Sequence, residues 1–318
     1  MSLDLSSLTT YVEENKSDLI EKAVLGSRTA GLVDVRTGIK SSENLPILES
    51  TVPFQSASSC GFTSSGTTSI TPVNIATTPI AVAESICLQD LETYFTQKWL
   101  PSGANNDSTA IAEAIANRKV ANINQRVEQA IWQSKTTYTN ATQLKHFNGL
   151  ISLIDSGSPV SATSSTMNES NVLTILNNVH ENIPAAAHWN EEIVIFVGMD
   201  VFKLAIQKIT STNYFHYDSD KAARNWEFTL PGTTAKVIAV PGLNNDNPVD
   251  SGSLPTAVQQ RVIATYKSNI VVGTDLQNDW EELEMWYSKD DRLLKFYTRF
   301  RLGVQIKFMD HVVEYTNS

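Results

Sequence analysis

A long amphipathic helix is the clearest periodic element of the sequence, and it is predicted over Thr109–Lys135. Its apolar positions repeat by threes and fours: Ala112, Ala116, Val120, Ile123, Val127 and Ala130. At roughly 3.6 residues per turn these side chains form one narrow, alanine-rich stripe that another element can approach closely. Ser108 precedes the pattern and is expected to cap the helix. A shorter amphipathic pattern over Leu5–Leu25 predicts an N-terminal helix that stops at Gly26.

Alternation of apolar and polar residues predicts a strand over Lys295–Phe308. Its apolar face consists of Phe296, Phe300, Leu302, Val304, Ile306 and Phe308. The segment before it, Glu282–Ser288, alternates in the same way, so the two are expected to pair. With a turn centred on Ser288–Asp291, the sequence predicts two cross-strand pairs: Glu284 with Lys295, and Leu283 with Phe296.

A compact α+β unit is predicted from Asn168 to Thr274, where helical and strand patterns alternate. The apolar run Ile193–Val197 is typical of a buried strand, and Asp200 is expected to cap the next helix. The other predicted elements are a helix over Glu169–Ile183, a helix over Asp200–Ile209 and a strand over Ala235–Leu243. Before this unit, His146–Ile154 is interpreted as a turn into a strand and Ser156–Ser165 as a linker or exposed loop.

A polar but uncharged segment runs from Ser50 to Ala83, without a single Asp, Glu, Lys or Arg. It has too many hydroxyl groups for a core, while its Thr, Val, Ile and Phe residues favour strands. Extended chain is predicted over Thr29–Ile86, with breaks at Gly61, Gly66, Pro72 and Pro79. Because a two-stranded hairpin alone is barely stable in water, it needs an outside surface. We expect that surface to be another copy of the same chain.

The composition is that of a globular protein with an acidic balance. The chain has 318 residues, of which 41% are hydrophobic and 18% charged, with a net charge of -10 and a pI near 5.0. This argues against binding nucleic acid through phosphate neutralisation, which needs clustered Lys and Arg. Cys60 and Cys87 have no metal-ligand spacing and favour reduced thiols over a disulfide. Without a signal-peptide pattern or a membrane-length apolar run, the protein is expected to be soluble and intracellular where it is made.

No recognisable catalytic or cofactor-binding motif is present in the sequence. Walker, GxGxxG and GxSxG patterns are absent, and no two histidines have HxxxH spacing. The histidines are His146, His180, His188, His216 and His311. The acidic run Asp275–Glu284 fits a solvated strand face better than a metal site, and Asn244–Gly252 fits an exposed turn better than a calcium loop. We therefore predict no enzyme activity, no cofactor and no metal.

The order of these segments resembles the major capsid proteins of tailed bacteriophages, the Hong Kong 97-type capsid fold, over essentially the whole chain. Glu43–Phe95 resembles the E-loop and its return strand, and Thr109–Gln133 followed by "HFNGLI" resembles the spine helix and its turn. Trp189–Ile209 resembles the A-domain strand and helix, and Arg292–Tyr315 the closing P-domain strands. The implied α+β fold has an N-terminal arm (1–28), an E-loop hairpin (29–88), a P domain (89–160 and 278–305, with a spine helix over 109–135) and an A domain (161–277 and 306–318).

This resemblance implies a shell subunit that self-assembles into hexamers and pentamers of an icosahedral head. The head would contain packaged double-stranded DNA without sequence-specific binding, reside in the virion and assemble in the bacterial host cytoplasm. A portal protein is an expected partner, scaffolding or decoration proteins are further candidates, and no membrane is involved. The E-loop residues expected to contact a neighbouring subunit are Leu45, Ile47, Phe54, Phe62, Ile70, Val73, Ile75 and Ile80. The candidate inter-subunit charge contacts are Lys40, Glu49, Arg299 and Arg301.

The sequence departs from some members of the family in its lysine positions, and two alternative functions remain open. Some members cross-link an E-loop lysine to a P-domain asparagine with help from a glutamate. Here Lys40 is the only lysine between Lys22 and Lys98, with no assignable partners, so we predict no cross-link. The first alternative is an encapsulin-type nanocompartment, which encloses a cargo enzyme. The second, a carbohydrate- or peptide-binding module, would be a monomer with clustered exposed aromatics, yet the uncharged segment has only Phe54 and Phe62.

Overall fold

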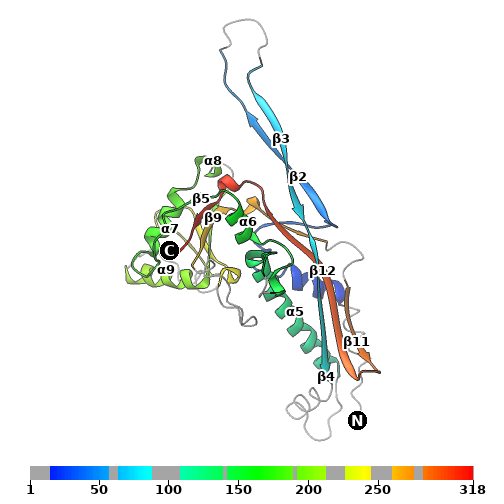
Figure 1. Ribbon diagram of the computed structural model, residues 1–318. Helices are drawn as coiled ribbons and strands as arrows, with labels where there is room; N and C mark the ends of the chain where they lie inside the picture. The colour runs from blue at the N-terminus through cyan, green and yellow to red at the C-terminus, as the bar shows by residue number, and fades with distance from the viewer. Residues whose placement is uncertain are drawn as a thin grey trace.

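The computed structural model describes residues 15–56, 64–87, 108–138, 142–188, 192–212, 226–244, 260–275 and 282–317. Helices and two sheets form a body, and a two-stranded arm projects from it (Figure 1). The predicted α+β class is confirmed by this mixture of elements. In the part of the chain that the structure describes, no helix is long and apolar enough to cross a lipid bilayer.

The first sheet joins strands from distant parts of the chain, in the order β1-β10-β12-β11, with β4 also paired to β12. Its strands are β1 (Asp34–Arg36), β4 (Thr78–Cys87), β10 (Ile270–Thr274), β11 (Glu282–Ser288) and β12 (Leu293–Ile306). Burial alternates along β12, and its predicted apolar residues from Phe296 to Ile306 are all buried. The alternating pattern therefore identified the central strand of this sheet correctly.

The register of β11 against β12 differs from the predicted one by two residues. The observed pairs are Glu284 with Tyr297, Met285 with Phe296 and Trp286 with Lys295. The predicted pairs, Glu284 with Lys295 and Leu283 with Phe296, are therefore wrong, because the turn lies one residue further along the chain. A shift by two residues keeps every side chain on its face, and Leu283 and Met285 are both buried as expected.

Helix α5 (Ser108–Gln133) follows the predicted long helix to within two residues, and Ser108 is its first residue. It shares the larger hydrophobic core with helix α2 (Lys16–Val24) and the inner face of the first sheet. The buried part of its stripe is Ala116, Val120, Ile123, Val127 and Ala130. The start of the predicted N-terminal helix, Leu5–Asn15, lies largely outside the described residues.

Helix α6 (Leu150–Ser156) replaces the strand predicted after the turn at His146, so that prediction is wrong. Its buried residues Leu150, Ile151 and Ile154 have helical spacing and no alternation. Gly149 precedes the helix, and a Cβ there would lie 2.8 Å from the backbone nitrogen of Ser134. The missing side chain lets α6 begin directly against the end of α5.

The second sheet has the order β5-β13-β9-β6-β8-β7. Its strands are β5 (Val160–Ser161), β6 (Ile193–Val197), β7 (Glu227–Thr229), β8 (Lys236–Ala239), β9 (Val262–Tyr266) and β13 (Val313–Tyr315). Helices α7 (Val172–Glu181), α8 (Ala185–His188) and α9 (Met199–Ser211) belong to the same lobe (Figure 1). Two predictions fail here. Ser156–Ser165 was predicted to be a linker or exposed loop, but it contains strand β5. Asp200 was predicted to cap α9, but Gly198 occupies the cap position and Asp200 lies in the first turn of the helix.

Strand β6 is buried on both faces, which explains its continuous apolar run. Ile193, Ile195 and Val197 belong to a second core with α7 and α9. Val194 and Phe196 face the first core, where the rings of Phe196 and Trp132 of α5 lie 5.5 Å apart. The two lobes of the body are thus packed through this sheet.

The arm consists of strands β2 (Ser42–Thr51) and β3 (Thr67–Ala76), paired antiparallel from Ser42 opposite Ala76 to Thr51 opposite Thr67, together with the described residues just beyond them, 52–56 and 64–66. After β3 only Thr77 intervenes before β4 enters the first sheet. The extended hairpin predicted for the uncharged segment is therefore present, although its residues 57–63, including Gly61, lie outside the described part of the chain.

Candidate assembly interface

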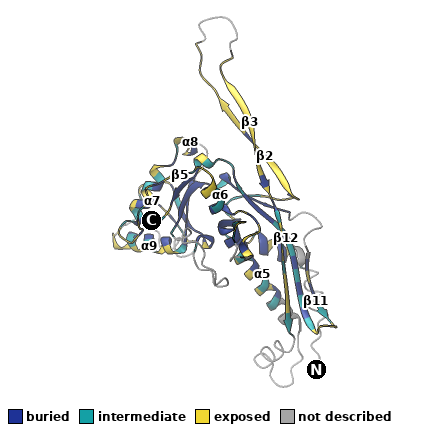
Figure 2. Cartoon of the chain, viewed as in Figure 1, coloured by how far each residue is buried: buried dark blue, intermediate teal, exposed yellow. Residues whose placement is uncertain are grey.

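The arm carries most of the exposed large apolar side chains. On it, Leu48 is 66% exposed, Val52 75%, Phe54 101% and Ile70 66%. Elsewhere in the described residues only Trp226 and Trp286 belong to this class, at 39% and 40%. Figure 2 shows both arm strands largely exposed, whereas most of the body strands are buried or half-buried. Scattered exposed apolar residues are ordinary, but a gathering of them on one projecting element marks a contact surface.

The register assigns the arm's apolar residues to two different faces. On one face Leu48 lies directly opposite Ile70, with Pro46 opposite Pro72 beside them. On the other face lie Leu45, Ile47, Val73 and Ile75, the last opposite Glu43. This second group lies near the root of the arm, and its members are buried or half-buried by the chain itself.

A small separate core fixes the root of the arm. It contains Ile75 at 0% exposure and Leu45 at 4%, together with Ile39 and Val271. Gly273 of β10 lies opposite Gly303 of β12, so the body surface is recessed at this point.

The pair of glycines is required for that close approach. A Cβ on Gly303 would lie 2.0 Å from the carbonyl oxygen of Ala76. A Cβ on Gly273 would lie 2.9 Å from Cδ1 of Ile75. Real Cβ atoms do not approach other atoms this closely. A side chain at Gly303 would displace the backbone of the arm, and one at Gly273 would displace the end of the Ile75 side chain.

Hydrogen bonds fix the position of Thr77, the residue between arm strand β3 and body strand β4. The backbone N–H of Thr77 donates to Ser41 O at 2.8 Å, and its Oγ1 donates to Ile39 O at 2.9 Å. Arg301 Nη1 donates to Thr77 O at 3.2 Å. Gln305 Nε2 donates to Asn74 O at 2.7 Å. The direction of the arm is therefore set by its own chain, before any partner is present.

Further out, polar side chains of the two strands bond to each other. Asn74 Nδ2 donates to Asn44 Oδ1 at 2.9 Å, and the hydroxyls of Ser50 and Thr68 lie 3.2 Å apart. Such cross-strand pairs stabilise the hairpin without adding charge. The face with Leu48 and Ile70 therefore combines apolar side chains with neutral polar ones.

The residues proposed from the sequence as neighbour contacts occupy different environments. Phe54 and Ile70 are exposed, Val73 and Ile80 are half-buried, and Phe62 lies outside the described residues. Leu45, Ile47 and Ile75 are buried within the chain, so they are not part of the exposed surface. Of the charged candidates, Lys40 and Glu49 are exposed and Arg299 and Arg301 are half-buried.

Sequence reasoning missed Leu48 and Val52. The signal for Leu48 is present in "NLPILES", where Ile47 and Leu48 are adjacent. In a strand, adjacent residues point to opposite faces, so one of the two had to face away from the root. No comparable signal marks Val52, which lies just beyond the end of β2.

The ionisable groups with shifted pKa values lie in the body, away from the arm. Glu128 of α5 is 3% exposed and accepts hydrogen bonds from the backbone N–H (2.9 Å) and Oγ1 (2.6 Å) of Thr29. Burial raises the pKa of Glu128, and these hydrogen bonds together with one from Gly242 only partly offset that effect. Trp132 Nε1 donates to the same Thr29 hydroxyl at 2.6 Å. These contacts of Glu128 and Trp132 therefore join α5 to the segments that contain Thr29 and Gly242.

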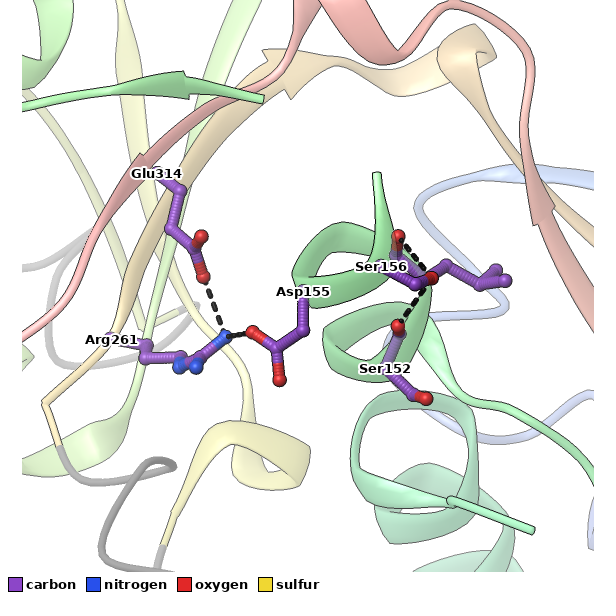
Figure 3. Close-up of polar contacts among 6 residues, drawn as sticks. Ser152, Asp155, Ser156, Arg261 and Glu314 are labelled. Carbon is purple, nitrogen blue, oxygen red and sulfur yellow. Dashed lines mark hydrogen bonds and ion pairs between the residues drawn. The ribbon is translucent and has the colours of Figure 1, made fainter. Parts of the chain in front are cut away.

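A second buried group links the two lobes (Figure 3). Arg261, which is 5% exposed, bonds through Nη1 to Asp155 Oδ1 of α6 at 2.7 Å and to Glu314 Oε1 of β13 at 2.5 Å. Burial raises the pKa of Glu314; Arg261 opposes this and Asp155 adds to it. One guanidinium thus holds two carboxylates, one on α6 and one on β13, and joins the two lobes through ion pairs.

The described residues contain no cluster of three or more His, Cys, Asp or Glu side chains suited to a metal ion. The rings of His180 and His188 lie 5.5 Å apart, and His311 stacks on Phe308. His216 and the loop after Asn244 lie outside the described residues. A cavity of about 390 Å³ between β4 and α5 is lined mainly by core residues such as Ile123, Phe296 and Phe300.

Comparison with known proteins gives a result for the fold alone. No protein-family model matches the sequence, and no curated protein matches it. Solved structures match over nearly the whole chain. The satellite phage P4 procapsid with its size determination (Sid) protein is 10% identical, with 95% of this chain and 90% of that chain covered and a TM-score of 0.59.

Two further solved structures show the same similarity. Gordonia phage Cozz is 13% identical, with 92% of this chain and 86% of that chain covered and a TM-score of 0.59. A virus-like particle from Pyrococcus furiosus is 11% identical, with 96% and 99% covered and a TM-score of 0.52. This chain therefore has the tailed-phage capsid fold that the order of its segments predicts.

Proposed function

We propose that this chain is the shell-forming subunit of a tailed-bacteriophage capsid and has no catalytic role. The observation that carries the proposal is the arm, which is held rigidly at its root yet leaves Leu48, Val52, Phe54 and Ile70 exposed in the isolated chain. A protein that stays monomeric gains nothing from such an element. The fold shared with the satellite phage procapsid over nearly the whole chain supports the same role.

In the proposed shell, the distal part of the arm lies across a neighbouring copy. Phe54, Phe62 and Ile70 remain the proposed contacts, joined by Leu48 and Val52. Leu45, Ile47, Val73 and Ile75 lie near the root of the arm, and Ile80 packs against the main core of the body. Burying the exposed apolar side chains of the arm against the neighbour would stabilise the assembly by about 25 cal/mol for each Å² of apolar surface removed from water. The neutral hydroxyls can pair with the neighbour without the desolvation cost of a buried ion. Lys40, Glu49, Arg299 and Arg301 stay candidate charge contacts.

The proposed assembly consists of hexamers and pentamers that close an icosahedral head around double-stranded DNA. A net charge of -10 suits a wall that contains DNA without adsorbing it. The core with α5 and the first sheet would belong to the P domain and the core with α7 and α9 to the A domain. A portal protein, and scaffolding or decoration proteins, would be the partners. Assembly would take place in the bacterial cytoplasm, with the mature protein in the virion.

The second candidate is the shell of an encapsulin-type nanocompartment. The observation that favours it is the similarity to the virus-like particle from Pyrococcus furiosus, which covers 99% of that chain. Both candidates are closed shells, so the arm has the same role in each. They differ in content, because purified particles hold either packaged DNA or a cargo protein, and electrophoresis of the contents distinguishes the two.

The decisive experiment is size-exclusion chromatography with negative-stain electron microscopy of the purified full chain. Capsomers, shells or tubes are expected. A stable monomer at high concentration would contradict the proposal for both kinds of shell.

A shortened arm makes the test specific. Residues 50–68 are replaced by Asn-Gly, which joins Glu49 to Ser69, two residues that already lie opposite each other. Asn-Gly favours the two-residue turn that such a pair needs. The variant should fold with unchanged tryptophan fluorescence, because no tryptophan lies within residues 50–68, but it should no longer assemble. If it failed to fold, the arm would be part of its own chain's core and the proposal would be wrong.

A further inference from the structure

The root of the arm determines which backbone groups of β2 and β3 point outward. Thr77 N donates to Ser41 O, so residues 41 and 77 form a hydrogen-bonded pair in line with the ladder. Such pairs alternate with pairs that are not hydrogen-bonded. The hydrogen-bonded pairs of the arm are therefore 43/75, 45/73, 47/71, 49/69 and 51/67. The pairs between them point their N–H and C=O groups away from each other, toward the two outer edges.

Two prolines face each other at one of these outward-pointing pairs. Pro46 lies opposite Pro72 in the middle of the arm. A hydrogen-bonded pair exchanges two N–H···O bonds, which two prolines cannot do, so this position agrees with the alternation read from the root. Each missing N–H therefore falls on an outer edge, one on β2 and one on β3.

The rest of the β3 edge near the root is covered by the body. Asn74 O accepts the hydrogen bond from Gln305, and Ala76 O lies against Gly303. Both are outward-pointing carbonyls, as the alternation requires. Beyond Pro72, only Ile70 and Thr68 present outward backbone groups within β3, and beyond Pro46 only Leu48 and Ser50 do so within β2.

We infer that Pro46 and Pro72 close both edges of the arm to strand addition, so that arms of separate copies cannot pair edge to edge. An exposed, uncharged strand edge is a template for uncontrolled pairing, and natural edges are often protected by proline or charge. Strand β3 carries no charged residue, whereas β2 carries Glu43 and Glu49, so on β3 proline is the protection available. The inference goes beyond the proposed shell function and holds whatever surface the face of the arm contacts.

The test restores both N–H groups in the full chain with the double variant P46T/P72T. Static light scattering is measured for wild type and variant over a series of increasing protein concentrations, which starts at one where the wild type does not associate. We expect association to begin at about tenfold lower concentration, the factor that corresponds to about 1.4 kcal/mol. The outward N–H groups of Leu48 and Ile70 should gain protection from hydrogen exchange in the associated state. P53T, on the same arm but outside the ladder, is the matched control and should behave as wild type.

A rescue separates edge closure from changes in side chains. In the P46T/P72T background, L48P/I70P closes the edges again at the next outward-pointing pair and should abolish the extra association. L48T/I70T removes the same apolar side chains but leaves the N–H groups, and it should not rescue.

Three results would overturn the inference: P46T/P72T associating no more than P53T, equal rescue by the threonine and proline variants, or loss of the body fold in P46T/P72T. The last result would assign the prolines a role in folding the chain.

Discussion

Strands β3 and β4 follow each other with only Thr77 between them, and each contains Thr, Pro, Ala and two Ile residues, yet their environments differ. Strand β4 lies along β12, and its Ile80 and Val82 pack against the main core. Strand β3 pairs with β2 in a two-stranded sheet, and most of its residues are exposed (Figure 2). Similar compositions therefore lead to a body strand in one case and a free arm in the other.

The pattern of apolar positions separates the two strands where composition does not. In β4, Ile80, Val82 and Ile86 lie on one face, which packs half-buried against the main core and is interrupted by the exposed Glu84. In β3 the period breaks between Ile70 and Val73, which places Ile70 on the opposite face from the root residues. The arm thus buries one face near the body and presents its other face further out.

The largest expected effect is at the root of β3. Ile75→Ala should lower the free energy of unfolding by about 2–5 kcal/mol, because it leaves a cavity in a core of four residues. Urea unfolding measures the change. The same substitution at the half-buried Ile80 in β4 should cost less. Equal losses at the two positions would mean that the root is no better packed than the body strand.

The next effect concerns the recess that receives the arm. Gly303→Ala introduces a Cβ 2.0 Å from a backbone oxygen that cannot rotate away. Overpacking of this kind costs about 1–3 kcal/mol, and we expect the upper part of that range. Gly31→Ala is the control, because the nearest atom to its Cβ lies 3.5 Å away. Wild-type stability of Gly303→Ala in urea would show that the sheet can shift to accept the side chain.

The sequence predicted the elements with long, regular patterns. Helix α5 and strand β12 were predicted almost to their ends, because each presents one face to a core along its length. The short helix α6 was not, because seven residues give too few repeats to separate helical spacing from a strand. The register of β11 failed by two residues, since a cross-strand charge pair is worth less than the turn geometry.

The candidate interface could be predicted only in part. The uncharged segment indicates an exposed hairpin, but the division into a buried root and a free distal part depends on Gly273 and Gly303, which lie far along the sequence from Ile75. Nothing local to Ile75 and Ile70 says which of them meets that recess. The outward-pointing N–H positions, by contrast, follow from the register as soon as one root hydrogen bond is known.

A smaller effect is expected on the pH dependence of the free energy of unfolding, which should change with a substitution in the body but not with one on the arm. Burial raises the pKa of Glu128 above its ordinary value of 4.5, so the folded protein binds this proton more tightly than the unfolded chain. Stability from this group is therefore lost as pH rises above about 4.5 and is regained on acidification. In urea unfolding at pH 5 and pH 7, Glu128→Gln should gain less stability on acidification than wild type. Glu49→Gln on the exposed arm should follow the wild type, and an unchanged pH dependence of Glu128→Gln would contradict the assignment.

The smallest effect on stability is expected on the distal face of β3. Ile70 is 66% exposed and lies opposite the equally exposed Leu48, so Ile70→Ser should change the free energy of unfolding by less than about 0.5 kcal/mol. The same variant should nevertheless weaken assembly in electron micrographs and light scattering, because it removes apolar area that the proposed neighbouring copy would bury. Thr68→Ser, on the same face but polar, is the matched control.

This pair of measurements distinguishes the two parts of one strand. Ile75→Ala should reduce stability, whereas Ile70→Ser should reduce association and leave stability unchanged. If Ile70→Ser assembled normally, the exposed face would not be the contact surface. If it unfolded more easily, the distal arm would already be packed within its own chain. Only a chain in which root and tip have separate roles gives the expected combination.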